Sequence, residues 1–171
     1  MTDTLSMHEI ELRLGQIKLL SLDVDGVMTD GGLYYTDEGK QFRKFNVKDG
    51  LGIKRAITAG VRICIISASK ATSTLTRAEH LGIQHVRIGA RDKLADLREI
   101  ASELQVELHE VAHMGDDLTD LELMQGVGLA LSVADAVPEV LDAAHYVTNK
   151  AGGKGAVREI CDLMVKNRNI S

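Results

Sequence analysis

Two carboxylates, Asp23 and Asp25, end a short apolar run, residues 17–24, and Gly26 follows at once. Glycine permits a sharp turn, so both side chains can be aimed at one point. Asp23 could attack phosphorus as a nucleophile and form an acyl phosphate. Asp25 could protonate the leaving alkoxide and later deprotonate the water that releases phosphate. An isolated acid pair is usually a solvated turn, but its place at a strand end favours phosphoryl transfer.

Phosphoryl transfer needs more than these two acids, because acid–base help contributes only about 10²–10⁴ of the rate enhancement. Two carboxylates that face a phosphate repel it unless a cation lies between them. The stretch Gly115-Asp-Asp-Leu-Thr-Asp120 follows another apolar run, residues 110–114, and offers the hard oxygen ligands that suit Mg²⁺. We expect Asp116 to bind the metal, whereas Asp117 and Asp120 could assist it or could cap a helix.

A lysine and a serine complete the set of chemical groups. Lys93 opens a predicted helix, residues 92–104, where a positive charge is unfavourable beside the positive end of the helix dipole. This position indicates a counter-charge elsewhere in the fold, although a solvated surface lysine is the alternative. Ser67 follows the apolar run at residues 61–66. Its hydroxyl could donate to a phosphoryl oxygen, or the residue could be an ordinary turn or cap serine.

The elements that would position these groups alternate along the chain. Short apolar runs predict buried strands, and apolar residues at helical spacing predict helices. The predicted strands are residues 17–24, 61–66, 84–88, 110–114, 128–131 and 145–147. The predicted helices are residues 71–81, ending at Gly82, and residues 92–104, 118–124, 137–144 and 156–165, with a weaker indication at residues 5–14. The alternation predicts an α/β fold with a doubly wound, Rossmann-like parallel sheet, in which chemistry collects at the carboxyl ends of the strands.

One segment, residues 32–47, breaks this alternation and predicts a β-hairpin insertion, because two short strand-like stretches flank a turn that contains Gly39. The segment holds four of the five aromatic residues of the chain, Tyr34, Tyr35, Phe42 and Phe45. So short an insertion cannot bury four rings by itself. It must pack on the rest of the domain or form a subunit interface, where aromatic residues are favoured.

The composition fits one globular domain. The 171 residues suffice for a single core, and a net charge of −5 argues against general nucleic-acid binding. The two cysteines, Cys64 and Cys161, indicate neither a disulfide framework nor a zinc site. No apolar run is long enough to span a membrane, and residues 1–14 lack the pattern of a signal peptide. We therefore expect a cytoplasmic protein of one domain, residues 1–171.

These motifs, in this order, resemble the haloacid dehalogenase-like phosphatase superfamily. Its first motif, Asp-x-Asp-Gly-x-x-Thr, is matched by Asp23, Asp25, Gly26 and Thr29. Its second, third and fourth motifs are matched by Ser67, Lys93 and Asp116 with Asp117. The resemblance implies catalytic roles for Asp23, Asp25, Ser67 and Lys93 and a substrate-binding role for Thr29. It also implies Mg²⁺ held by Asp23, Asp116 and the main-chain carbonyl of Asp25.

Within this superfamily, residues 17–165 resemble the small phosphatases without a cap domain that act on 3-deoxy-D-manno-octulosonate 8-phosphate in lipopolysaccharide biosynthesis. The resemblance rests on residues 23–31, 45–53, 115–117, 133–136 and 152–159. It implies a phosphorylated sugar acid as substrate and a homotetramer in which hairpins associate and neighbouring subunits help to close the site. It also makes Lys154 or Arg158 candidate contacts for an anionic substrate. Lys48 and Asp49 are further candidates, or a simple helix start.

The second motif departs from that family, which usually carries Ser-Gly-Arg where this chain has Ser67-Ala-Ser69. Arginine is the side chain best shaped for a carboxylate, so its absence bears on the substrate. Lys70 could compensate, or the enzyme could prefer another ulosonate phosphate, such as a nine-carbon, sialic-acid-like 9-phosphate. Two other classes remain: a receiver-like signalling domain, against which the order of motifs argues, and a non-catalytic subunit, against which the full motif set argues.

Overall fold

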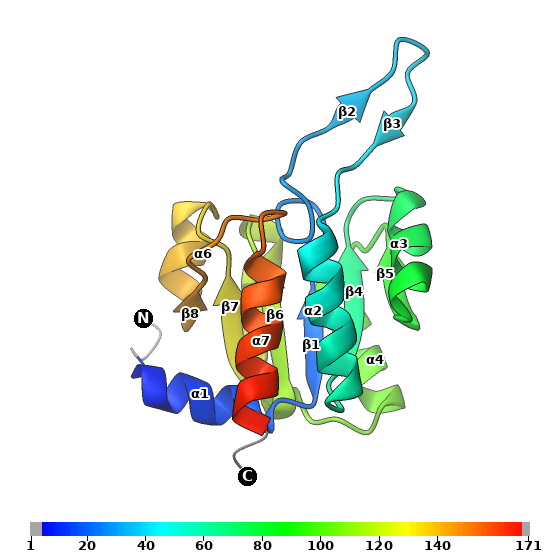
Figure 1. The fold of residues 1–171 in the computed structure, drawn as a ribbon. Helices are drawn as coiled ribbons and strands as arrows, with labels where there is room; N and C mark the ends of the chain where they lie inside the picture. The colour runs from blue at the N-terminus through cyan, green and yellow to red at the C-terminus, as the bar shows by residue number, and fades with distance from the viewer. Residues whose placement is uncertain (1–4, 169–171) are drawn as a thin grey trace.

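The computed structural model describes residues 5–168 and contains a six-stranded, fully parallel sheet in the order β5-β4-β1-β6-β7-β8 (Figure 1). All four residues of the central strand β1, Leu19–Leu22, are buried. Such a strand reads as a continuous apolar run because both faces of the sheet are covered. The other strands are β4 (Arg62–Ser67), β5 (His85–Ile88), β6 (Val111–Gly115), β7 (Leu129–Ser132) and β8 (Tyr146–Val147). The predicted α/β fold is confirmed.

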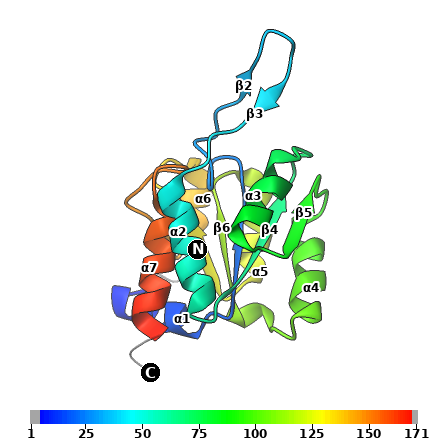
Figure 2. The same ribbon diagram turned by 45° about the vertical axis from the view of Figure 1, so that its right-hand side comes forward.

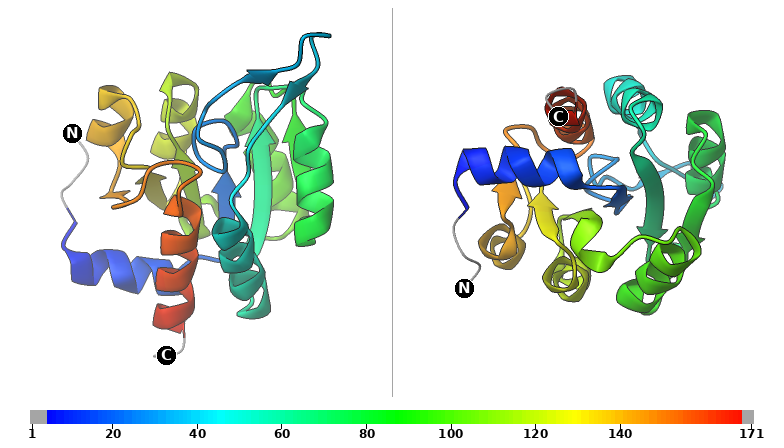
Figure 3. Two further views of the ribbon diagram at one scale, coloured as in Figure 1. Left: turned by 45° about the horizontal axis from the view of Figure 1, so that its top comes forward. Right: turned by 90° about the horizontal axis from the view of Figure 1, so that it is seen from below.

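Helices cover both faces of the sheet (Figure 3). Leu20 and Leu22 share a core cluster with Ile53 and Ile160, whereas Leu19 points to the opposite cluster. This split follows from the alternation of side chains along a strand. The first face carries α1 (Met7–Gln16), α2 (Val47–Thr58), α3 (Ser73–Leu81) and α7 (Ala156–Arg168). The second face carries α4 (Lys93–Glu103), α5 (Leu121–Gly126) and α6 (Pro138–Ala143).

Two helices differ from what the sequence predicted. The helix expected at residues 118–124 begins as a 3-10 turn, Leu118–Asp120, and only then continues as α5. For α2 the sequence indicated no more than a possible helix start at Lys48 and Asp49. Gly50 and Gly52 weaken a helical pattern. Close packing against neighbouring residues explains why glycine stands at both positions. A side chain on Gly50 would meet Arg77, and one on Gly52 would lie 3.0 Å from the Cα atom of Arg158 on α7.

The predicted hairpin is present and projects beyond the carboxyl end of the sheet (Figures 1 and 2). Its strands are β2 (Tyr34–Tyr35) and β3 (Gln41–Phe42), paired in antiparallel fashion. Phe45 packs on the core, but Tyr35 is 62% exposed and Phe42 is 51% exposed. The tip of the hairpin therefore displays aromatic surface, and only its base is tied to the body of the protein.

The described chain has no cap domain over the sheet, since the hairpin is the only insertion between the core elements of residues 5–168. Within these residues, no helix is long and apolar enough to cross a membrane. The outermost residues of the expected single domain, 1–4 and 169–171, lie outside the described part of the chain.

Candidate active site

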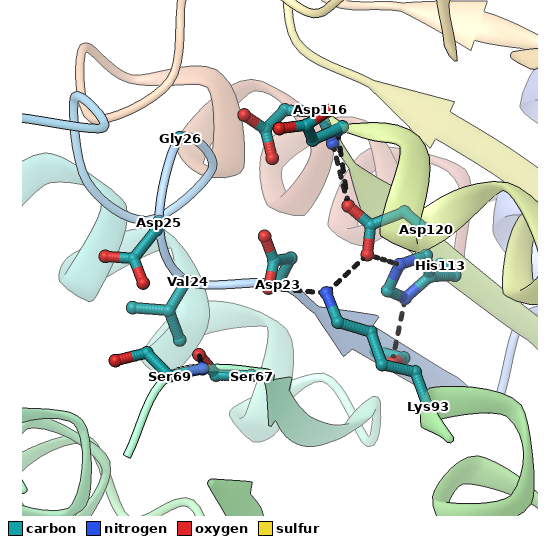
Figure 4. A network of polar contacts seen from close by, with 12 residues as sticks. Asp23, Val24, Asp25, Gly26, Ser67, Ser69, Lys93, His113, Asp116 and Asp120 are labelled. Atoms are coloured by element: carbon teal, nitrogen blue, oxygen red, sulfur yellow. Dashed lines mark hydrogen bonds and ion pairs between the residues drawn. The ribbon is translucent and has the colours of Figure 1, made fainter. Parts of the chain in front are cut away.

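The side chains predicted to do chemistry meet at the carboxyl end of the sheet, around Asp23 (Figure 4). Asp23 directly follows β1 and is 6% exposed. Lys93, at the first position of α4, places its Nζ atom 2.9 Å from Oδ1 of Asp23 and 2.7 Å from Oδ1 of Asp120. The counter-charge that the position of Lys93 predicted is therefore present. The carboxyl ends of neighbouring parallel strands bring these distant residues together.

The loop that carries Asp25 is held by Thr29. The Thr29 hydroxyl accepts from the backbone N–H groups of Gly26 and Gly31, each at 3.2 Å, and donates to the carbonyl oxygen of Val24. Thr29 is fully buried, so from this position it cannot contact a substrate. The expected substrate-binding role of Thr29 is therefore corrected to a role in shaping the loop.

Gly26 is needed in this loop for two reasons. Its φ of +89° lies in the region that favours glycine. A Cβ atom on Gly26 would also lie 1.9 Å from Oδ2 of Asp116, which follows β6. The close approach of the Gly26 backbone brings the Asp116 carboxylate against the loop of Asp25, so the first and fourth motifs share one site.

Asp23, Asp116 and Asp120 each offer a carboxylate oxygen, and these three oxygens lie within 4.8 Å of one another. Oδ1 of Asp116 is buried without a hydrogen-bond partner in the described chain. Burial, together with repulsion from Asp23 and Asp120, raises the pKa of Asp116 to about 8. Burial also raises the pKa of Asp23, with repulsion from Asp120 as a further cause. A divalent cation would relieve this repulsion, so the donor set fits such an ion.

Asp120 has a different environment from the other two acids. Its Oδ1 atom accepts from Lys93 and lies 3.2 Å from Nε2 of His113, and its Oδ2 atom accepts from the backbone N–H groups of Asp116 and Asp117. Burial opposes ionisation of Asp120, but the contacts with His113 and Lys93 outweigh it and lower its pKa. Asp120 therefore anchors Lys93, which leaves Asp23 and Asp116 as the available carboxylates. Asp117 is exposed and caps the 3-10 turn at Leu118.

Lys93 keeps its charge in this environment. Burial disfavours the ammonium, but the carboxylates of Asp23 and Asp120 outweigh that effect and raise the pKa of Lys93. His113, fully buried on β6, extends the network, since its Nδ1 atom lies 3.0 Å from the hydroxyl of Ser21 on β1. Sequence reasoning missed His113, although a single polar residue inside the apolar run of β6 was a signal.

Ser67 ends β4 and is 1% exposed, and its hydroxyl accepts from the backbone N–H of Ser69 at 3.2 Å. The second residue that sequence reasoning missed is Arg43, at the base of the hairpin. Its Nε atom donates to Oδ1 of Asp25 at 2.6 Å, and its Nη2 atom donates to the hydroxyl of Ser69 at 2.8 Å. No sequence pattern indicated these contacts, because the direction in which a hairpin side chain points depends on the angle at which the hairpin leaves the domain.

Four further substrate-binding candidates lie at or near the starts of α2 and α7. Asp49 is 2% exposed and accepts from the backbone N–H of Arg158 at the start of α7, and the side chain of Arg158 pairs with Asp162. These contacts give both residues a role in packing α7, and their substrate contacts stay predictions. Lys48 and Lys154 are exposed, and their substrate contacts stay predictions.

The glycine-rich loop before α7 lies against the loop of the first motif. The backbone N–H of Gly153 donates to the carbonyl oxygen of Val27 at 3.0 Å, and a Cβ atom on Gly152 would lie 1.7 Å from the carbonyl oxygen of Gly26. Lys70 follows β4, and its side chain lies 3.0 Å from the position of a Cβ atom on Gly89. Its compensating role stays a prediction.

Comparisons with known proteins agree with this geometry. The family model described as haloacid dehalogenase-like hydrolase matches residues 86–160. The chain is 46% identical, over 90% of its length, to the 3-deoxy-D-manno-octulosonate 8-phosphate phosphatase of Yersinia pestis, 82% of which is covered. The chain is thus a haloacid dehalogenase-like hydrolase. Within that class it belongs to the family of 3-deoxy-D-manno-octulosonate 8-phosphate phosphatases and is a phosphoric monoester hydrolase.

Two solved structures extend the comparison. The phosphatase of the same name from Moraxella catarrhalis, in complex with a magnesium ion, a phosphate ion and a KDO molecule, has a TM-score of 0.93 at 38% identity. That match covers 96% of this chain and 94% of the other. The cobalt-bound form of the Haemophilus influenzae enzyme has a TM-score of 0.88 at 34% identity, with 92% of each chain covered.

Proposed function

We propose that this protein hydrolyses a phosphorylated sugar acid, 3-deoxy-D-manno-octulosonate 8-phosphate, through an aspartyl-phosphate intermediate on Asp23. The observation that carries the proposal is the convergence of Asp23, Asp116 and the Lys93 ammonium at one point, with the carboxylate of Asp25 on the adjoining loop. A buried carboxylate flanked by a fixed cation can attack a phosphoryl group whose negative charge would otherwise repel it.

Each residue has a separate task in this proposal. An oxygen of Asp23 forms the new bond to phosphorus as the bond to the leaving oxygen breaks, and Asp25 gives that oxygen its proton. Water then attacks the phosphoaspartate, Asp25 takes the proton of the water, and Asp23 is regenerated. The Lys93 ammonium and the Ser67 hydroxyl would donate to the phosphoryl oxygens.

Magnesium is the metal that we propose for the site. Asp23 and Asp116 would hold it through side-chain oxygens, and Asp25 through its main-chain carbonyl. When bound, the ion supplies positive charge that offsets repulsion between the carboxylates and the phosphate. The raised pKa of Asp116 and its unpartnered buried oxygen support a cation here. The magnesium ion in the Moraxella catarrhalis structure supports this choice, and the cobalt-bound Haemophilus influenzae form supports a site for a divalent ion more generally.

The identity of the sugar acid is a separate part of the proposal. The relatives support the eight-carbon ulosonate phosphate. Ser69 stands where the family usually carries arginine, so a nine-carbon ulosonate 9-phosphate is the second candidate.

The proposal is tested by comparing kcat/KM for the two ulosonate phosphates with that for neutral sugar phosphates in the presence of Mg²⁺. We expect the eight-carbon acid to exceed glucose 6-phosphate by at least about 100-fold, which corresponds to about 2.7 kcal/mol of discrimination. Equal values for acidic and neutral substrates would contradict the sugar-acid assignment. Preference for the nine-carbon acid would replace the first candidate with the second.

We also propose that the protein acts as a homotetramer assembled through its hairpins. The support is the exposed apolar surface of the hairpin, where Leu33, Tyr35 and Phe42 are each more than half exposed. Aromatic side chains of this kind are enriched in subunit interfaces.

A further inference from the structure

Arg43 is a hairpin residue whose guanidinium lies inside the active site. Its side chain is only 3% exposed, although the hairpin around it is largely solvent-exposed. A buried arginine is costly unless its N–H groups are paired. Arg43 is 18 positions from Asp25 and 26 from Ser69, so it joins the loop of the first motif, the base of the hairpin and the segment that follows β4.

The contacts of Arg43 fix the plane of the guanidinium. Nε donates to Oδ1 of Asp25 at 2.6 Å, with a longer contact of 3.4 Å from Nη2 to Oδ2. Nη2 also donates to the hydroxyl of Ser69 at 2.8 Å, and Nη1 donates to Oε1 of Gln41 at 3.1 Å. The guanidinium is a rigid, planar fork, so anchoring it at Ser69 and Gln41 also sets the orientation of the carboxylate that it grips.

The orientation of the Asp25 carboxylate depends on its contacts with Arg43. Within residues 5–168, Arg43 is the only residue with a hydrogen bond to the Asp25 carboxylate, whose side chain is 32% exposed. A partly exposed carboxylate with no other anchor is free to rotate. Each carboxylate oxygen has two lone pairs, so the arginine occupies one and leaves another for a reacting group.

We propose that Arg43 is the positioning residue for Asp25, so that the hairpin carries part of the acid–base machinery. The proposal rests on the proposed function, in which the proton of Asp25 goes to the leaving oxygen as that oxygen separates from phosphorus. In the second half of the reaction, the water proton returns to Asp25 as the water oxygen binds phosphorus. Arg43 exchanges no proton in either half, since its guanidinium stays charged throughout.

The test uses Arg43→Met and two kinds of substrate. The leaving alkoxide of a sugar phosphate needs a proton, whereas the leaving group of 4-nitrophenyl phosphate is stable as an anion. If Arg43 positions Asp25, kcat/KM of Arg43→Met falls about 10- to 100-fold on the best sugar phosphate, a part of the 10²–10⁴ that acid–base catalysis contributes. On 4-nitrophenyl phosphate kcat/KM stays within about threefold of wild type, because bond formation by Asp23 needs no proton transfer from Asp25.

The phosphoenzyme gives an independent readout. Hydrolysis of the phosphoaspartate needs Asp25 as a base, whichever substrate supplied the phosphate. The kcat of Arg43→Met should therefore fall on both substrates. After an acid quench, Arg43→Met should also retain more protein-bound phosphate than wild type. A general structural defect would lower kcat/KM equally on both substrates and would leave no excess phosphoenzyme. That outcome overturns the positioning role.

Three further variants sharpen the test. Lys40→Met removes a hairpin cation that has no hydrogen bond or ion pair to Asp25 in the described structure, and it is expected to leave kcat/KM for both substrates unchanged. Ser69→Ala removes one anchor of the guanidinium and should shift the ratio of the two kcat/KM values in the same direction as Arg43→Met, by less. Arg43→Lys keeps the charge but loses the fork, so the ratio should stay altered. Full recovery by lysine would show that charge alone matters and would contradict the proposal.

Failure of the proposed function is distinguishable from failure of this inference. If the wild-type protein hydrolyses neither substrate, both the proposed function and the role of Arg43 are wrong. A wild-type protein that hydrolyses both, with equal losses in Arg43→Met, removes only the role of Arg43. If Arg43→Met raises KM for sugar acids alone, Arg43 binds the substrate directly and the positioning role is wrong.

Discussion

The Nζ atom of Lys93 lies 2.9 Å from Oδ1 of Asp23, although 70 positions separate the two residues. The side chains are 6% and 9% exposed, so water screens the pair poorly. Asp120 shares the same ammonium at 2.7 Å. One cation thus holds two buried carboxylates, and this is why the position of Lys93 matters for stability as well as for chemistry.

Replacement of Lys93 by methionine is expected to destabilise the metal-free protein by about 3–5 kcal/mol, because it leaves buried carboxylates without their partner. Urea unfolding followed by circular dichroism measures the change. The double variant Lys93→Met/Asp120→Asn is the matched control and should recover part of the loss, since one uncompensated charge is removed. A double variant no more stable than Lys93→Met would contradict the shared-cation account.

Gly26→Ala and Gly60→Ala separate backbone strain from crowding in the site. Both glycines have a φ of +89°, but a Cβ atom on Gly26 meets Asp116, whereas one on Gly60 meets nothing within 4 Å. Each variant should lose about 1–2 kcal/mol of stability from the left-handed conformation. Only Gly26→Ala should also lose phosphatase activity, because it displaces the Asp116 carboxylate. Equal activity losses in the two variants, measured at saturating Mg²⁺, would contradict the assigned contact.

The stability of the metal-free protein should depend on pH through Asp116. Its carboxyl ionises near pH 3.8 in an unfolded chain and near pH 8 in the folded protein. Between these values the folded state binds the extra proton, so stability falls as pH rises. The raised pKa of Asp23 acts in the same direction. Thermal unfolding from about pH 5 to about pH 8 should therefore show a declining Tm, and Asp116→Asn should flatten the decline.

Magnesium should reverse this trend, because it replaces the proton at Asp116. At a concentration of about 100 times Kd, a ligand that binds only the folded state adds about 2.7 kcal/mol. The Tm gain of the wild type should therefore be larger at pH 8 than at pH 5, and it should be largely lost in Asp116→Asn. A gain that is equal at both pH values, or unchanged in the variant, would exclude Asp116 as a ligand.

The oligomeric state should depend on the exposed surface of the hairpin. Leu33→Glu/Tyr35→Glu places two charges there without replacing Arg43, and we expect it to convert a tetramer into smaller species in light scattering coupled to size exclusion. Leu12→Glu, at a residue of α1 that is 55% exposed, is the control for added surface charge. An unchanged mass for the hairpin variant, or an equal change in the control, would defeat the interface proposal.

The sequence predicted the parts of the site that follow from chain topology. Asp23, Ser67 and Asp116 follow parallel strands, and such strands end at one edge of a sheet, so their convergence could be expected before any coordinates. The partner of Lys93 could be expected for a similar reason, since an ammonium at a helix start needs a counter-charge. The roles of these residues in catalysis stay predictions until activity is measured.

Arg43 and His113 could not be placed from the sequence, because their roles depend on side-chain directions. Arg43 reaches Asp25 only through the angle at which the hairpin leaves the domain, and no periodicity sets that angle. His113 lies opposite Ser21 in the pairing of β6 with β1, and its contact with Asp120 depends on the 3-10 turn. Thr29 and Asp49 fit family motifs, but both are buried. Thr29 shapes the loop of the first motif, and Asp49 packs against the start of α7.

The central claim is that the carboxylate of Asp23 becomes phosphorylated during turnover. Reduction with borohydride during a rapid-quench reaction, followed by peptide mass analysis, converts a phosphoaspartate to homoserine and identifies its position. We predict homoserine at residue 23 only when substrate and Mg²⁺ are both present, and none in Asp23→Asn. Homoserine at Asp25 or Asp116, or hydrolysis at the normal rate without any labelled residue, would contradict the account.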